Sequence, residues 1–129
     1  MIARHKLRLA VLISGRGSNM EAIARACAQQ QIEAMIVRVI ADRADAAGVA
    51  IAHRMGLVGT VIERADYPGR EAHEAAVGDA IDGCDAQLVA LAGYMRILSP
   101  AFVQKYAGRL LNIHPSLLPA PRWRPIRST

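Results

Sequence analysis

Five short apolar runs recur along the chain and are separated by more polar segments. Each run holds four to eight residues, mainly aliphatic, with too little alternation for a strand that faces water on one side. The pattern therefore predicts buried strands at residues 7–13, 34–41, 57–62, 86–92 and 110–113.

Segments with helical spacing of apolar positions lie between these runs. In the first segment, Met20, Ile23 and Cys27 would share one face of a helix. Helices are predicted at residues 19–30, 45–55, 70–81 and 100–106. Gly56 is a stop signal for the second helix, and Pro100 suits the first turn of the last.

Strand and helix alternate from the first run to the last. This order is typical of a parallel sheet with helices on both faces and right-handed crossovers. The predicted fold class is α/β, with a Rossmann-like open parallel sheet. No linker or repeat interrupts residues 1–120, which we expect to form one domain.

Composition narrows the class of protein. Hydrophobic residues make up 53% of the chain and aromatic residues only 4%, so the core must be aliphatic. No apolar run approaches the roughly 18 residues of a membrane span, and no membrane partner is expected. Cys27 and Cys84 have neither metal-binding nor redox spacing, which favours free thiols in a cytoplasmic protein.

The last nine residues, 121–129, differ from the rest of the chain in composition and pattern. They contain three of the 16 basic residues, no acidic residue and the only Trp, without periodicity. Most of the net charge of +5 therefore comes from this segment. We expect an irregular or disordered tail and no nucleic-acid partner. A short nucleic-acid-binding arm is the alternative.

The segment Ser14-Gly15-Arg16-Gly17-Ser18-Asn19 joins the first strand to the first helix. It is no dinucleotide fingerprint, because Met20 stands where the third glycine would be, and no Gly-Lys-Ser/Thr of a Walker loop follows. A phosphate monoester held by Gly17, Ser18 and Asn19 is one interpretation. An ordinary turn with Asn19 as N-cap is the other.

A second candidate loop, Gly93-Tyr94-Met95-Arg96-Ile97-Leu98, follows the fourth strand. Arg96 between apolar neighbours would suit a pocket for a planar, partly charged ligand, or it is a surface side chain. Arg70, at a loop-to-helix junction, is either an anion contact or a solvated residue. His53 and His73 lie among charged residues and are predicted as surface side chains. No residue set has metal-ligand spacing, so no metal is expected.

The segment Asn112-Ile113-His114-Pro115-Ser116-Leu117-Leu118-Pro119 ends the last strand. On extended backbone, Asn112 and His114 would point to the same side, and the prolines would stiffen the segment. An amide donor and an imidazole suit acyl transfer, with Asn112 stabilising an oxyanion and His114 moving a proton. In isolation, the pattern favours a turn-capping Asn and a backbone-bonded His over this chemistry.

Taken together, three motifs resemble phosphoribosylglycinamide formyltransferases, a folate-dependent family of purine synthesis. They are the residues 14–19, the residues 92–100 (Ala-Gly-Tyr-Met-Arg-Ile-Leu-Ser-Pro) and the residues 110–119. The resemblance covers residues 7–120 in order and spacing. It implies formyl transfer from 10-formyltetrahydrofolate to the amine of glycinamide ribonucleotide, without a metal.

The resemblance also implies roles for matching positions. Gly17, Ser18 and Asn19 would hold the ribonucleotide. The folate contacts would be Arg70, Met95, Arg96, Ile97, Leu98 and Asn112. His114 would be the catalytic proton donor, beside Asn112. Methionyl-tRNA formyltransferases and formyltetrahydrofolate deformylases share the His-Pro-Ser block, but the former would not be expected to carry the first loop, and the latter usually add an N-terminal domain.

The sequence departs from the family pattern after Ala120. Further strands, a loop with an Asp that tunes the catalytic His, and a C-terminal helix are expected there, but no Asp follows Asp85. The break resembles a truncation or frameshift. It predicts weak or no activity, and an uncovered sheet edge that would favour association of chains. The alternative functions are an impaired fragment that binds a phosphoribosyl ligand, or another folate-dependent formyltransferase or deformylase.

Overall fold

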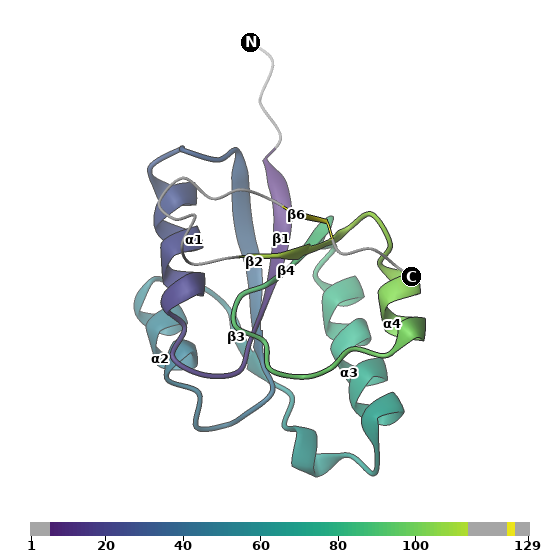
Figure 1. The fold of residues 1–129 in the computed structure, drawn as a ribbon. Helices are drawn as coiled ribbons and strands as arrows, with labels where there is room; N and C mark the ends of the chain where they lie inside the picture. The colour runs from purple at the N-terminus through teal and green to yellow at the C-terminus, as the bar shows by residue number, and fades with distance from the viewer. Residues whose placement is uncertain (1–5, 114–123, 126–129) are drawn as a thin grey trace.

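The computed structural model describes residues 6–113 and 124–125 (Figure 1). The strands are β1 Leu7–Ile13, β2 Ala34–Ala41, β3 Gly59–Val61, β4 Leu88–Leu91, β5 Leu110–Asn112 and β6 Arg124–Pro125. The helices are α1 Ser18–Ala28, α2 Ala47–Arg54, α3 Arg70–Gly83 and α4 Pro100–Lys105, with a 3-10 turn, η1, at Arg64–Asp66. All nine strands and helices predicted from the sequence are present, with ends shifted by a few residues.

The strands form one sheet in the order β3-β2-β1-β4-β5-β6. The first five are parallel, which confirms the predicted fold class. β1 lies at the centre, between β2 and β4, and its residues Leu9 to Ile13 are completely buried. Burial on both faces explains why this strand reads as a continuous apolar run.

Helices cover both faces of the sheet. α1 and α2 lie on one face and α3 and α4 on the other (Figure 1). On α1, Met20, Ile23 and Cys27 are buried against β1 and β2, as their spacing predicts. On the opposite face, Phe102 of α4 and Tyr106, the residue that follows α4, pack with their ring centroids 4.9 Å apart.

β6 lies within residues 121–129, which were expected to be irregular, and corrects that expectation for residues 124–125. It pairs antiparallel with β5, placing Pro125 opposite Leu111 and Arg124 opposite Asn112. The edge of β5 offers unpaired backbone groups that any extended segment can bind, and Pro is tolerated in an edge strand. Composition alone therefore missed these two residues; the rest of the tail lies outside the described part of the chain.

His73 is a second correction, because it is only 2% exposed instead of lying on the surface. It shares a buried face of α3 with Val77 and Ile81. Its Nε2 donates to the carbonyl oxygen of Ile62 at 2.7 Å, and its ring meets Tyr67 edge-on. The neighbouring charged residues lie on other faces of the helix, so the polarity of the local sequence did not indicate that His73 is buried.

Cys27 and Cys84 are buried free thiols, as expected. Burial raises the pKa of Cys27, so this thiol stays protonated near neutral pH. Within residues 6–113, no helix has both the length and the apolar character needed to cross a bilayer.

Ser99 fixes the start of α4 and gives a test of this part of the fold. Its Oγ accepts from the N–H of Phe102 at 3.1 Å, and its own N–H and O–H donate to Glu74 of α3. Ser99→Ala is expected to lower the free energy of unfolding by about 1 kcal/mol in urea denaturation. Ser18→Ala is the control, because α1 has no side-chain cap bond. Equal losses in both variants would contradict this account of the α3–α4 contact.

Candidate functional site

The predicted site residues that the structure describes gather at one end of the sheet, where the parallel strands end. The turn after β1 holds Gly17, Ser18 and Asn19, and Asn112 ends β5. Arg70 begins α3, and residues 93–98 (the β4 loop) connect β4 to α4 (Figure 1). Between β1 and β4 the strand order reverses, and open α/β sheets bind ligands at this position.

Gly17 caps α1 in the left-handed conformation, with φ of 78°. The helix therefore begins at Ser18, and Asn19 is not its N-cap, which corrects that detail of the ordinary-turn interpretation. No side chain caps the first turn, which leaves backbone N–H groups of α1 without a partner inside the helix. Behind the turn, the N–H of Gly48 donates to the carbonyl oxygen of Gly15 at 3.1 Å. The turn is thus braced by α2 and open at the helix N-terminus.

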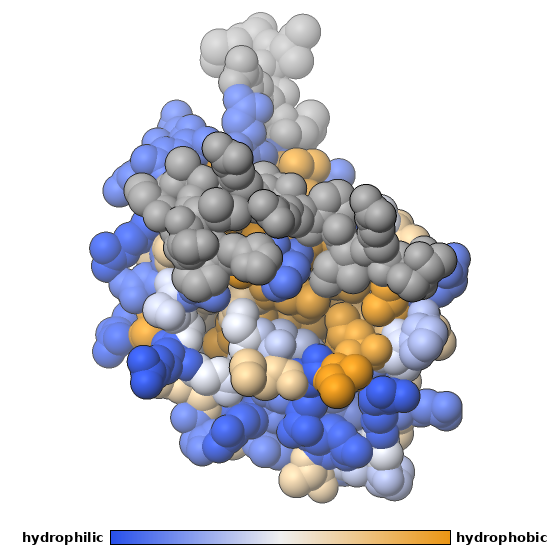
Figure 2. Space-filling view, in the orientation of Figure 1, coloured by the Kyte–Doolittle hydropathy of each residue, from blue (hydrophilic) through white to orange (hydrophobic). Residues whose placement is uncertain are grey.

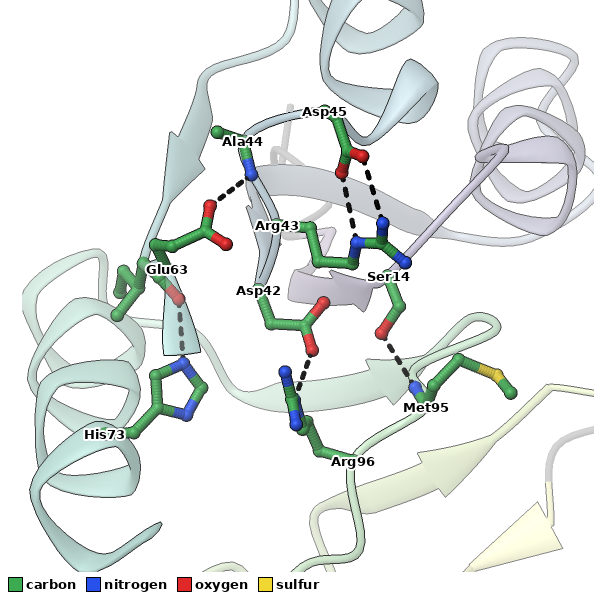
Figure 3. Close-up of polar contacts among 10 residues, drawn as sticks. Ser14, Asp42, Arg43, Ala44, Asp45, Glu63, His73, Met95 and Arg96 are labelled. Atoms are coloured by element: carbon green, nitrogen blue, oxygen red, sulfur yellow. Dashed lines mark hydrogen bonds and ion pairs between the residues drawn. The ribbon is translucent and has the colours of Figure 1, made fainter. Parts of the chain in front are cut away.

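The β4 loop is held by two contacts to other strands (Figure 3). The N–H of Met95 donates to Ser14 Oγ at 2.8 Å, just beyond β1. Arg96 Nε donates to Asp42 Oδ2 at 2.7 Å, just beyond β2. At and next to these anchors the loop presents apolar side chains to solvent, with Met95 80% and Ile97 81% exposed.

A cavity of about 320 Å³ lies between the β4 loop and the start of α3. Its lining residues are Arg64, Arg70, His73, Glu74, Tyr94, Met95, Arg96, Ile97 and Leu98. The structure therefore brings together every predicted folate contact except Asn112. Figure 2 shows hydrophobic surface over the β4 loop, bordered by hydrophilic surface below it.

Three arginines make the cavity wall cationic. Arg64 Nη1 donates to the carbonyl oxygen of Tyr67 at 3.2 Å, and Arg70 makes no hydrogen bond or ion pair to other described residues. The lining carboxylate, Glu74, is already bonded to Ser99. Burial, followed by the charge of Asp42, raises the pKa of Tyr94, which therefore stays a neutral phenol. An anionic ligand with an apolar body would match this wall.

Asn112 is exposed at the end of β5, whereas its neighbours Leu111 and Ile113 are buried. The N–H of Ile113 donates to the carbonyl oxygen of Leu91 at 3.1 Å, which fixes the backbone beside the amide. This alternation agrees with the extended backbone predicted for the segment. His114 lies outside the described residues, so its position beside Asn112 stays a prediction. In the described ranges, no three potential metal ligands cluster.

Sequence reasoning missed two residues that shape this site, Asp42 and Ser14. Both are buried polar side chains directly after strands, at 2% and 3% exposure. Their position was a usable signal, because the carboxyl end of a buried parallel strand is where such sheets place functional groups. What the sequence could not show is that the β4 loop crosses β1 to reach them.

Comparison with known proteins agrees with this geometry. The formyl transferase family model matches residues 7–127. The phosphoribosylglycinamide formyltransferase of Escherichia coli strain K12 is 46% identical over 113 residues, covering 88% of this chain and 53% of that protein. The trifunctional purine biosynthetic protein adenosine-3 of Homo sapiens is 43% identical over 117 residues, covering 91% of this chain and 12% of that protein.

Solved structures agree as well. The phosphoribosylglycinamide formyltransferase from Brucella melitensis is 47% identical with a TM-score of 0.82, over 89% of this chain and 60% of that one. The chain spans about half the length of the curated bacterial relatives it matches. The resemblance seen in the motifs is thus confirmed. Since the family model accounts for most of its residues, the chain belongs to the formyl transferase family.

Proposed function

We propose that this domain transfers a formyl group from 10-formyltetrahydrofolate to the amine of glycinamide ribonucleotide, in purine biosynthesis. The observation that carries the proposal is the cationic, apolar-rimmed cavity, whose β4 loop is bonded through Met95 to Ser14, just before the turn that leads to the uncapped N-terminus of α1. The names of the bacterial relatives, phosphoribosylglycinamide formyltransferases, support the same reaction. Buried free thiols are compatible with a cytoplasmic location.

The ribonucleotide would bind at the turn after β1. Backbone N–H groups of Ser18 and Asn19 and the dipole of α1 would attract its phosphate, and Gly17 lets the backbone approach closely. The amine of the ligand would then lie toward β5, where Asn112 ends the strand.

The formyl donor would occupy the cavity beside the β4 loop. Its planar ring would lie against the apolar side chains of residues 95–98, while Arg70 would pair with a carboxylate of its tail. The exposed Met95 and Ile97 and the unpaired Arg70 fit such a ligand.

In the reaction, the amine nitrogen of the ribonucleotide bonds to the formyl carbon, and negative charge builds on the formyl oxygen. Asn112 would donate its amide N–H to that oxygen. The bond from the formyl carbon to the folate nitrogen then breaks. His114 would take the proton that the attacking amine loses and deliver one to the leaving nitrogen, so that charge balances.

A second candidate is a protein that binds the phosphoribosyl ligand with impaired turnover. It is favoured by the turn proposed for the phosphate, which lies wholly among the described residues and where the uncapped N-terminus of α1 offers backbone N–H groups.

Formyl transfer by the purified 129-residue chain tests the proposal directly. Formylated glycinamide ribonucleotide would be measured by mass spectrometry, with His114→Ala as the control, and ribonucleotide binding by calorimetry. Turnover that His114→Ala abolishes would support the proposed reaction. Binding without turnover in a folded chain would favour the second candidate, and neither binding nor turnover would overturn both.

A further inference from the structure

Asp42 sits where no ligand contact was predicted, yet it joins two walls of the cavity. Its side chain accepts from Arg96 Nε at 2.7 Å, and its backbone oxygen accepts from the N–H of Arg64 at 3.2 Å. Arg64 and Arg96 both line the cavity. β1 separates β2, which carries Asp42, from β4, which carries the loop of Arg96. The contact therefore reaches across the strand at which the sheet order reverses (Figure 3).

The ion pair is asymmetric in exposure. The Asp42 side chain is 2% exposed, while that of Arg96 is 43% exposed. The other carboxylate oxygen, Oδ1, is buried and has no hydrogen-bond partner among the described residues. The buried charge of Asp42 is thus compensated mainly by Arg96, and a displaced guanidinium would leave it unpaired.

Ser14 provides a second anchor for the β4 loop, at the residue next to Arg96. Its buried Oγ accepts the Met95 N–H, so consecutive residues of the loop are bound to the ends of β1 and β2. Such a restraint sets the loop in one shape before any ligand arrives, which lowers the entropy lost on binding. With Nε bonded to Asp42, Arg96 keeps its two terminal nitrogens for the cavity.

We propose that Asp42 is a positioning residue, which orients Arg96 and, together with Ser14, holds the β4 loop in the shape that receives the formyl donor. This inference rests on the proposed function. It adds that the donor site depends on a carboxylate that the donor itself does not touch.

Calorimetric binding of 10-formyltetrahydrofolate and, separately, of glycinamide ribonucleotide tests this role in the 129-residue chain. Asp42→Ala is expected to raise the Kd for the folate about tenfold and leave the Kd for the ribonucleotide unchanged. Asp42→Asn should stay within about threefold of the parent, because a carboxamide oxygen still accepts from Arg96. Asp45→Ala is the control, since Asp45 pairs with Arg43 on the surface.

Equal folate affinity in Asp42→Ala and the parent would overturn the proposal, as would equal losses in Asp42→Ala and Asp42→Asn. Hydrogen exchange of the Met95 amide in the ligand-free chain separates this outcome from failure of the proposed function. Exchange about tenfold faster in Ser14→Ala and Asp42→Ala would support the restraint on the loop. A parent chain that binds no folate but keeps this protection would overturn the donor assignment, with the restraint retained.

Discussion

Replacing Asn112 with alanine is expected to lower kcat for formyl transfer about 100-fold, with a much smaller change in the KM for either substrate. The reason is that the amide would bond the formyl oxygen most strongly when that oxygen carries negative charge. Asn112 is suited to this task because its backbone lies between β4 and β6 and its buried neighbours hold the strand end. Steady-state kinetics with each substrate varied in turn would measure the change in kcat separately from the changes in KM.

Gln104→Ala is the matched control for this change. Gln104 carries the same functional group, is exposed on α4 and makes no side-chain bond among the described residues. A kcat unchanged in Gln104→Ala but reduced in Asn112→Ala would assign the effect to the position of the amide. Wild-type kcat in Asn112→Ala would show that this side chain does not reach the reacting oxygen.

Gly17→Ala is expected to lower the free energy of unfolding by about 3 kcal/mol. Two penalties combine at this position. The backbone has φ of +78°, which L side chains rarely adopt, and an added Cβ would collide with the backbone of Gly48 in α2. A Cβ added to Gly48 would likewise collide with Ile13 and Gly17, so the two glycines are in close contact. Urea denaturation followed by circular dichroism would measure the loss.

Gly15→Ala provides the comparison within the same turn. Its φ is not in the left-handed region, and a Cβ there would meet no atom within 4 Å. We expect its stability to stay within about 0.5 kcal/mol of the parent. A Gly17→Ala variant as stable as Gly15→Ala would mean that the turn relaxes away from α2, and the close contact of Gly17 and Gly48 would then not brace the proposed phosphate site.

The parallel part of the fold could be predicted because its signals are local. Strands buried on both faces, such as β1, need unbroken apolar runs, and the apolar face of α1 repeats with the helical period. Differences between the predicted and observed ends of the helices have local causes as well. α1 starts one residue early because Gly17, and not Asn19, takes the cap position.

The features that were missed depend on distant parts of the chain. β6 exists because β5 has an open edge, which no property of Arg124 or Pro125 reveals. His73 is buried because α3 turns that face to the sheet and Ile62 supplies a carbonyl oxygen. Both corrections come from tertiary contacts that override local polarity.

The candidate site divides in the same way. Arg70 and the β4 loop could be grouped by resemblance, and the structure places them around one cavity. For Asp42, its place after a buried strand was a signal in the sequence. Its bond to Arg96, 54 residues away in the chain, could be found only in the structure.

The central position of β1 also constrains how the chain folds as it is synthesised. One edge of β1 pairs with β2, soon after it in sequence, but the other edge pairs with β4, where Arg8 meets Gln87 79 residues later. Contacts of such long range form slowly, and synthesis proceeds at about 5–20 residues per second. For several seconds, a strand whose residues Leu9 to Ile13 will be completely buried therefore has a free edge. In this interval the nascent chain is most exposed to aggregation and most in need of a chaperone.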